Sequence, residues 1–219
     1  TSKAQNFVPN DPAVSLDKKG LNEIHPQAQN ALAAQKAWQQ FKQKHPSWQA
    51  WFNEQTGMPH RAYGKPFAIP GKSIRAKAQQ FINDHLKGFG IKKDKLEITS
   101  VRSANNYHYV DMRQYHEGRK VLTSRVTLRF TDAQKLALFG LDYYSDITVA
   151  EEAGFDAQKA RMFATRGLNA KIKKAEVNND MLILPVNGAY RLVYKVMVKG
   201  YDDVEHRPVQ YNTLIDAQN

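Results

Sequence analysis

The segment at residues 107–130 constrains the fold of this chain more than any other part of the sequence. Its second half, RVTLRF at positions 125–130, alternates polar and apolar residues. An alternation with period two is typical of a strand that is buried on one face. Glu117 and Gly118 separate it from an earlier run of β-favouring residues, YHYVDMRQYH. The segment therefore predicts an antiparallel hairpin with its turn near Gly118.

Two helical patterns precede this hairpin. Over residues 27–42, apolar and aromatic residues recur at steps of three and four, which predicts one amphipathic helix ended by His45 and Pro46. A second helix is expected to begin after the capping residue Ser73 and to end at Gly88 and Gly90. Between the two, residues 48–70 are expected to form a short strand, a glycine turn and an extended segment.

Strand and turn signals surround the hairpin. Residues 96–102 and 135–144 read as strands, so the hairpin and these two strands predict an antiparallel meander. The helical pattern returns over residues 148–168. It fits either one kinked helix that begins at a capping box at Thr148 or a helix that begins only at Asp156.

Three further strand signals close the chain, at residues 181–186, 189–199 and 209–215. Asn187 and Gly188 between the first two are a strong hairpin signal, and residues 200–208 read as a polar loop. The second half of the chain therefore repeats the order of the first, a helix laid over an antiparallel meander. We expect an α+β protein with two small units, each a helix packed on one face of a curved antiparallel sheet.

Composition narrows the class of protein. The chain has no cysteine and no run of about 18 apolar residues that could span a bilayer. Its net charge is +11, and between His60 and Arg102 ten Lys and Arg residues face three acids. A basic face of this kind either attracts an acidic partner or is simply solvated. Because no aromatic residues are interleaved with these charges in the sequence, the solvated reading is preferred and nucleic acid is not expected as a partner.

The residues give no sign of catalysis. There is no His-Glu-x-x-His helix, no Gly-x-Ser-x-Gly turn, no cysteine nucleophile and no glycine-rich phosphate loop. His60 has no second histidine at metal-ligand spacing. We therefore expect no catalytic residue, no cofactor, no small-molecule ligand and no metal site in this chain.

Four stretches in order resemble the propeptides of secreted fungalysin- and thermolysin-type zinc metalloproteases, which consist of an FTP segment followed by a PepSY-type segment. The similarity covers residues 48–219. In the third stretch, the residues that keep the family's chemistry are His108, Gln114, Tyr115, Gly118 and Val121, and in the last they are Ile215, Asp216 and Ala217. The four stretches are WFNEQTGMPHRAYGKPFAIPG, AKAQQFINDHLKGFGI, HYVDMRQYHEGRKVLTSRVTLRF, and AYRLVYKVMVKG with VQYNTLIDAQN.

The resemblance implies two cystatin-like units: an FTP-like unit at residues 47–146 and a PepSY-like unit at 147–219. Residues 1–46 would be an extended arm and an amphipathic helix. It further implies a non-catalytic chaperone and inhibitor that is secreted or periplasmic. Its partner would be the catalytic domain of a metalloprotease, attached in cis, with no membrane involved. Because the chain lacks an initiator Met and a signal-peptide pattern, we expect a removed leader or a fragment.

Two other functions remain open at this point. One is a free-standing PepSY-like protein-binding module of the periplasm or cell surface, and the other, less favoured, is a basic nucleic-acid-binding domain. Four residues are predicted to contact a partner: Gln114, Tyr115, Arg61 and Tyr63. For Gln114 and Tyr115 the competing interpretation is that both satisfy hydrogen bonds inside the sheet.

Overall fold

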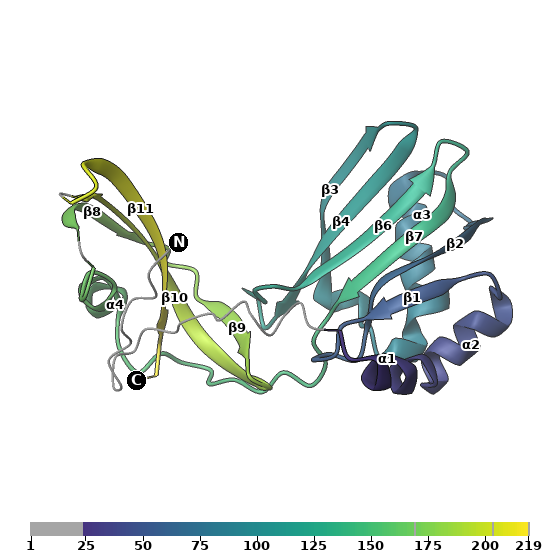
Figure 1. Cartoon of the computed structure of the whole chain (residues 1–219), viewed down its shortest axis with the longest axis horizontal. Helices are drawn as coiled ribbons and strands as arrows, with labels where there is room; N and C mark the ends of the chain where they lie inside the picture. The colour runs from purple at the N-terminus through teal and green to yellow at the C-terminus, as the bar shows by residue number, and fades with distance from the viewer. Residues whose placement is uncertain (1–23, 169, 203, 219) are drawn as a thin grey trace. The chain divides into compact units, whose positions relative to one another are not determined.

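The computed structural model describes residues 24–168, 170–202 and 204–218. The chain divides into two compact units, one spanning Lys19–Ile147 and the other containing Thr148–Asn219. In each unit, helical segments pack on an antiparallel sheet (Figure 1), so the expected α+β class is confirmed. The arm predicted over residues 1–26 lies almost entirely outside the described residues. Within the described residues, no helix is long and apolar enough to cross a membrane.

The first unit contains a seven-stranded sheet in the order β1-β2-β7-β6-β4-β3, with β5 paired to β4. All of its neighbouring strands are antiparallel, and β3, β4, β6 and β7 form the predicted meander. The strands are β1 (Gln49–Phe52), β2 (Pro59–Ala68), β3 (Leu96–Ala104), β4 (Tyr107–His116), β5 (Arg119–Lys120), β6 (Arg125–Thr131) and β7 (Lys135–Asp142).

The predicted hairpin turns at Glu117 and Gly118, whose φ angles are 50° and 75°. Two successive positive φ angles are typical of a tight turn whose twist matches that of the flanking strands. The register of strand pairing along β4 then shifts. Tyr115 lies opposite Lys120, whereas Met112 lies opposite Val126, so extra residues bulge out between β5 and β6. The hairpin is confirmed, but its second strand is interrupted.

The helix predicted over residues 27–42 is two helices, α1 (Pro26–Ala33) and α2 (Lys36–Lys44). Gln35 between them is extended, with φ −62° and ψ 144°, and its side-chain amide donates to the carbonyl of Gly57 at 2.9 Å. The break therefore comes from a contact with the β1–β2 turn, a tertiary cause that local periodicity does not report. Neither Gly nor Pro stands at the break.

The helix predicted after Ser73 is confirmed as α3 (Ile74–Phe81). The Ser73 hydroxyl accepts the N–H of Ala76 at 3.1 Å, as an N-cap does. The chain then continues through a π-helical turn, η2 (Ile82–Leu86), and a short 3₁₀ turn, η3 (Lys87–Phe89). A second 3₁₀ turn, η4 (Lys93–Lys95), leads into β3. Gly90 ends this run in the left-handed conformation, with φ 73°.

The core of the first unit lies between the helices and one face of the sheet. In β6 the buried residues alternate with more exposed ones, as period two requires. The aromatic residues Trp38 and Phe41 of α2 are buried in this core together with Trp48, Phe81 and Phe139. The aromatic stripe of the first helical pattern is therefore core.

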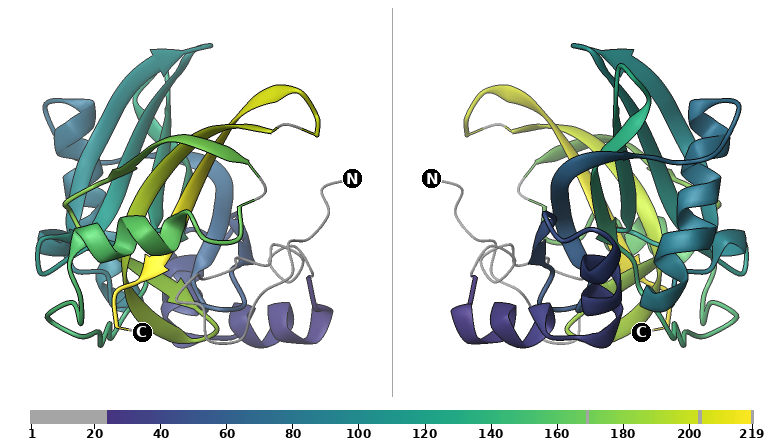
Figure 2. Two further views of the ribbon diagram at one scale, coloured as in Figure 1. Left: turned by 90° about the vertical axis from the view of Figure 1, so that its left-hand side faces the viewer. Right: turned by 90° about the vertical axis from the view of Figure 1, so that its right-hand side faces the viewer.

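The second unit packs α4 (Ala157–Ala164) across a four-stranded antiparallel sheet in the order β11-β10-β8, with β9 paired to β10 (Figure 2). The strands are β8 (Lys171–Val177), β9 (Leu182–Val186), β10 (Ala189–Asp202) and β11 (Arg207–Asp216). The carboxylate of Asp156 accepts the N–H of Lys159 at 2.9 Å, so the helix begins at Asp156. The segment after Thr148 is not helical despite its capping-box spacing.

Two expectations for this unit are corrected. The polar loop predicted over residues 200–208 is much shorter, because β10 continues to Asp202 and β11 begins at Arg207. The sequence reading also missed β8, whose residues, KIKKAEV, are mostly charged. Its pairing with β10 supplies the stability that its composition does not indicate.

Candidate functional site

The face of the seven-stranded sheet opposite α2 and α3 is the candidate functional site, and we call it the open face. It consists of the strand residues that alternate with the core residues. One row of cross-strand neighbours runs across five strands of this face. Its members, in order, are Arg102, Tyr109, Arg129, Leu138 and Tyr63. Residues distant in sequence therefore become direct neighbours on one surface.

Arginine and tyrosine side chains interleave at one end of this row. The guanidinium carbon of Arg102 lies 4.8 Å from the ring centroid of Tyr109. That of Arg129 lies 4.9 Å from the Tyr109 ring and 5.6 Å from the Tyr107 ring. At such distances each cation–π contact contributes about 0.5–1 kcal/mol at an exposed site. The contacts hold flexible arginine side chains in fixed positions on the sheet.

Asp111 balances part of this positive charge. Its Oδ1 accepts hydrogen bonds from Arg125 at 2.8 Å and from Thr127 at 3.0 Å, while Arg102 lies 3.6 Å from its Oδ2. Burial raises the pKa of Asp111, but these hydrogen bonds and the two arginine charges lower the pKa further than burial raises it. Asp111 is therefore ionised and committed to its two arginines.

Arg129 has no such partner. Among the described residues it forms none of the ion pairs, and its Nε is buried without a hydrogen-bond partner. A buried donor that lacks an acceptor costs free energy. Because no carboxylate among the described residues neutralises Arg129, its guanidinium leaves net positive charge on the open face.

The other end of the open face is aromatic and exposed. Trp51 on β1 is 54% exposed and Tyr63 on β2 is 41% exposed, and their rings meet edge to face with centroids 6.5 Å apart. Arg61, opposite Trp51 in the β1–β2 pairing, is exposed as well. Large exposed aromatic residues beside an arginine are enriched where proteins bind other proteins.

The four residues predicted to contact a partner fall into different environments. Arg61 and Tyr63 lie on the exposed end of the open face. Tyr115 is half-buried, and burial followed by the nearby Glu97 raises the pKa of its hydroxyl. Gln114 is buried, and its amide bonds the main chain of Tyr144 at 2.6 Å and 2.9 Å. For Gln114, the geometry matches the interpretation in which it satisfies hydrogen bonds inside the sheet.

The sequence reading missed most of the open face. It noted the alternation of Arg125, Thr127 and Arg129, but it looked for interleaved aromatic residues only in the basic stretch from His60 to Arg102. In the structure, Tyr107 and Tyr109 of β4 lie between Arg102 of β3 and Arg129 of β6. The alternation of Tyr107, Tyr109 and Asp111 along β4 was the available signal.

His60, considered as a possible metal ligand, is paired instead with a carboxylate. Its Nδ1 lies 2.8 Å from Oδ1 of Asp142, and the Asn53 amide donates to the same oxygen at 3.1 Å. The hydrogen bond to Asp142 raises the pKa of His60, although burial opposes it. In the part of the chain that the structure describes, no group of three or more His, Cys, Asp or Glu side chains could hold a metal ion.

The motif that closes the chain is structural in its geometry. Arg191 on β10 donates to Oδ2 of Asp216 on β11 at 2.5 Å, and the Gln218 N–H donates to the other carboxylate oxygen at 3.0 Å. The side chain of Asp216 is only 4% exposed. The buried carboxylate of Asp216 therefore holds β11 against β10 through Arg191, whose side chain is 45% exposed.

Comparison with known proteins gives little more. No protein-family model and no curated protein matches the chain. Among solved structures, it is similar to the C-terminal domain of YpeB from Bacillus megaterium, at 12% identity and a TM-score of 0.36. The match covers 90% of this chain and 94% of that chain. A similarity of this strength carries no argument about function, which must come from the open face itself.

Proposed function

We propose that this chain is a non-catalytic, PepSY-like protein-binding module of the periplasm or cell surface, and that its open face contacts the partner. The observation that carries the proposal is the interleaving of Tyr107 and Tyr109 with Arg102 and Arg129 on a sheet face that none of the described helices of its unit covers (Figure 1). Ordered arginines and tyrosines are the residue types that dominate binding energy in protein interfaces.

The charge of the open face indicates the kind of partner. Its arginines outnumber its carboxylates, and the carboxylate of Asp111 is already paired. An acidic protein surface would bring oxygens to Arg129 and exclude water from the tyrosine rings. Because part of the attraction is between charges, affinity should fall as salt rises.

A photo-crosslinking amino acid at position 51 tests this proposal in the native cell or its secretions. We expect a discrete crosslinked protein, identified by mass spectrometry, that is lost when Arg102→Glu and Arg129→Glu are combined. The matched control carries the crosslinker at position 75, since Arg75 is exposed on α3 on the helix side of the sheet. Equal crosslinking from both positions, or no effect of the arginine changes, would rule out the open face as the interface.

A second candidate is a propeptide that assists and inhibits a zinc metalloprotease in cis. The observation that favours it is the placement of the four propeptide-like stretches, which coincide with β1–β2, α3 and its π turn, β4–β6, and β10–β11. The acidic partner would then be the catalytic domain.

Inhibition in trans separates the two candidates. The purified chain is added to the catalytic domain of a fungalysin-type metalloprotease, and peptide hydrolysis is measured from about 50 to about 300 mM salt. The propeptide function predicts inhibition that weakens with salt and is reduced by Arg129→Glu. Full protease activity at every salt concentration would leave the protein-binding module as the function.

A further inference from the structure

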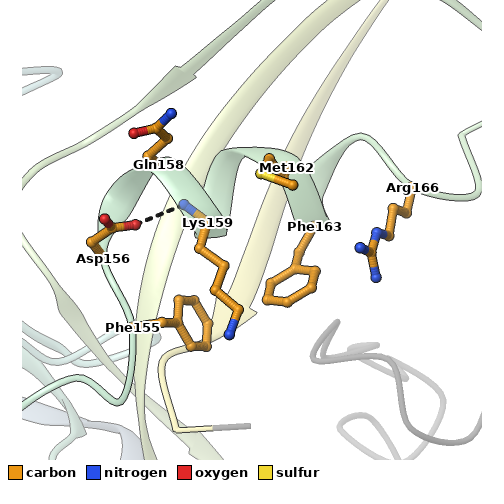
Figure 3. A pocket seen from close by; sticks show the side chains of 7 residues that line it. All are labelled: Phe155, Asp156, Gln158, Lys159, Met162, Phe163 and Arg166. Carbon is orange, nitrogen blue, oxygen red and sulfur yellow. Dashed lines mark hydrogen bonds between the residues drawn. The ribbon is translucent and has the colours of Figure 1, made fainter.

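The second unit has a hollow lined by α4 and the two residues before it, and the open face does not involve this hollow (Figure 3). Its volume is about 540 Å³, within the range of about 300–1,000 Å³ common for ligand pockets. It is open to solvent along its length rather than enclosed. It is lined by Phe155, Asp156, Gln158, Lys159, Met162, Phe163 and Arg166.

The hollow is built around aromatic rings. Phe155 and Phe163 meet edge to face with centroids 5.4 Å apart, and Phe155 also lies 6.0 Å from the ring of Tyr194 on β10. Met162 is 54% exposed beside them. A flexible, polarisable methionine next to two phenylalanines can adapt to an apolar side chain of a ligand. Phe155 and Phe163 also pack against the core of the second unit, whereas Met162 is left free to contact a ligand.

Two cations lie over the same rings. The Lys159 Nζ is 5.3 Å from the Phe155 centroid and 5.6 Å from the Phe163 centroid, and the Arg166 guanidinium is 4.8 Å from Phe163. Neither cation forms an ion pair within the described residues. The carboxylate in the hollow, that of Asp156, accepts the main-chain N–H of Lys159 and caps the helix, as the dashed line in Figure 3 marks.

We propose that this hollow binds an acidic peptide segment in which a large apolar side chain is flanked by carboxylates. The apolar side chain packs against Phe155, Met162 and Phe163. The carboxylates meet Lys159 and Arg166, which lie close enough to the same ring to act together. An open hollow suits a side chain presented by a peptide, whereas a lipid tail would need to be enclosed along its length. The inference rests on the second unit alone. It is independent of the function proposed for the open face.

Fluorescence anisotropy tests this binding with the whole chain. The probe is a short fluorescein-labelled peptide in which Phe is flanked by Glu on both sides in a Gly-Ser context. Combining Lys159→Glu with Arg166→Glu should weaken binding about tenfold or more, since it reverses both charges. The matched control is Arg161→Glu, because Arg161 is an exposed residue of the same helix that does not line the hollow. The affinity of this variant for the peptide should stay within about twofold of that of the unchanged chain.

Thermal unfolding shows whether the double variant folds, and further measurements test the proposal if it folds poorly. Met162→Ser should weaken peptide binding, and so should replacing Phe by Ser or Glu by Gln in the peptide. Combining Arg102→Glu with Arg129→Glu on the open face should leave the affinity for the peptide unchanged. The proposal is overturned if the unchanged chain does not bind the peptide, or if Arg161→Glu weakens binding as much as the double variant. It is also overturned if the Ser peptide binds equally well, or if only vesicles of anionic phospholipid are bound.

Discussion

The side-chain amide of Gln114 pairs with the main chain of Tyr144 as a neighbouring strand would. Its Nε2 donates to the Tyr144 carbonyl at 2.6 Å, and its Oε1 accepts the Tyr144 N–H at 2.9 Å. The Gln114 main chain is satisfied too, since its N–H donates to the hydroxyl of Ser124 and its carbonyl accepts from Val121. One buried residue thus closes the bulge before β6 and holds the chain as it leaves β7.

Replacing Gln114 by Leu should destabilise the first unit by about 1–3 kcal/mol, because the polar groups of Tyr144 lose their buried partners. Urea unfolding followed by tryptophan fluorescence measures the change. Gln79→Leu, at an exposed position on α3, is the matched control and should change the free energy of unfolding little. An unchanged stability together with lost partner binding would mean that Gln114 acts at the interface after all.

Asp216→Asn should destabilise the second unit by about 1.5–3 kcal/mol, because a nearly buried carboxylate loses its charge-assisted bond to Arg191. The exposed pair of Arg207 and Glu205 provides the comparison, and Glu205→Gln should cost about 1 kcal/mol or less. Chemical unfolding monitored by circular dichroism gives both values. Similar losses in the two variants would contradict the structural role assigned to Asp216.

Stability should fall in mild acid because of His45. Burial lowers the pKa of His45 to about 4, helped by the neighbouring His85 and Lys44 charges, and its Nε2 is buried without a partner. The folded state therefore binds fewer protons than the unfolded state, whose ordinary value is 6.5. The stability contributed by the neutral ring is present above pH 6.5 and is lost as pH falls toward 4.

The variant His45→Phe tests this origin of the acid sensitivity. It keeps an aromatic ring stacked on Phe67, whose centroid lies 3.8 Å from that of His45, but removes the titration. Melting temperatures measured between about pH 7.5 and about pH 5 should fall less in the variant than in the parent chain. His60, whose pKa is raised, contributes with the opposite sign and is unchanged in both proteins. Parallel pH profiles would show that His45 is not the sensor.

Acrylamide quenching should distinguish the three tryptophans of this chain. Trp51 is 54% exposed, whereas Trp38 and Trp48 are 3% and 0% exposed. Quenching should therefore affect one component of the fluorescence, and Trp51→Phe should remove that component without a loss of stability. A partner bound to the open face should protect it. Strong quenching that persists in Trp51→Phe would mean that a core tryptophan is accessible.

Local patterns predicted most of the elements correctly. The cap at Ser73, the turn at Glu117 and Gly118 and the alternation in β6 each depend on residues within a few positions of one another, so the sequence reports them directly. The break at Gln35 and the strand β8 depend on partners elsewhere in the chain, and both were missed. For the start of α4, the local sequence contains two capping sites, Thr148 and Asp156, and does not distinguish between them.

By itself, the sequence determined the α+β class, the meander and the aromatic composition of the core, because hydrophobic periodicity is a local property of the chain. Only the tertiary structure decided what the polar residues do. Strand pairing places Tyr109 between Arg102 and Arg129, and it buries Gln114 against Tyr144 while leaving Tyr63 exposed. Which polar side chains meet, and which face is left uncovered, follows from strand register and helix packing. These are long-range relationships that no local pattern encodes.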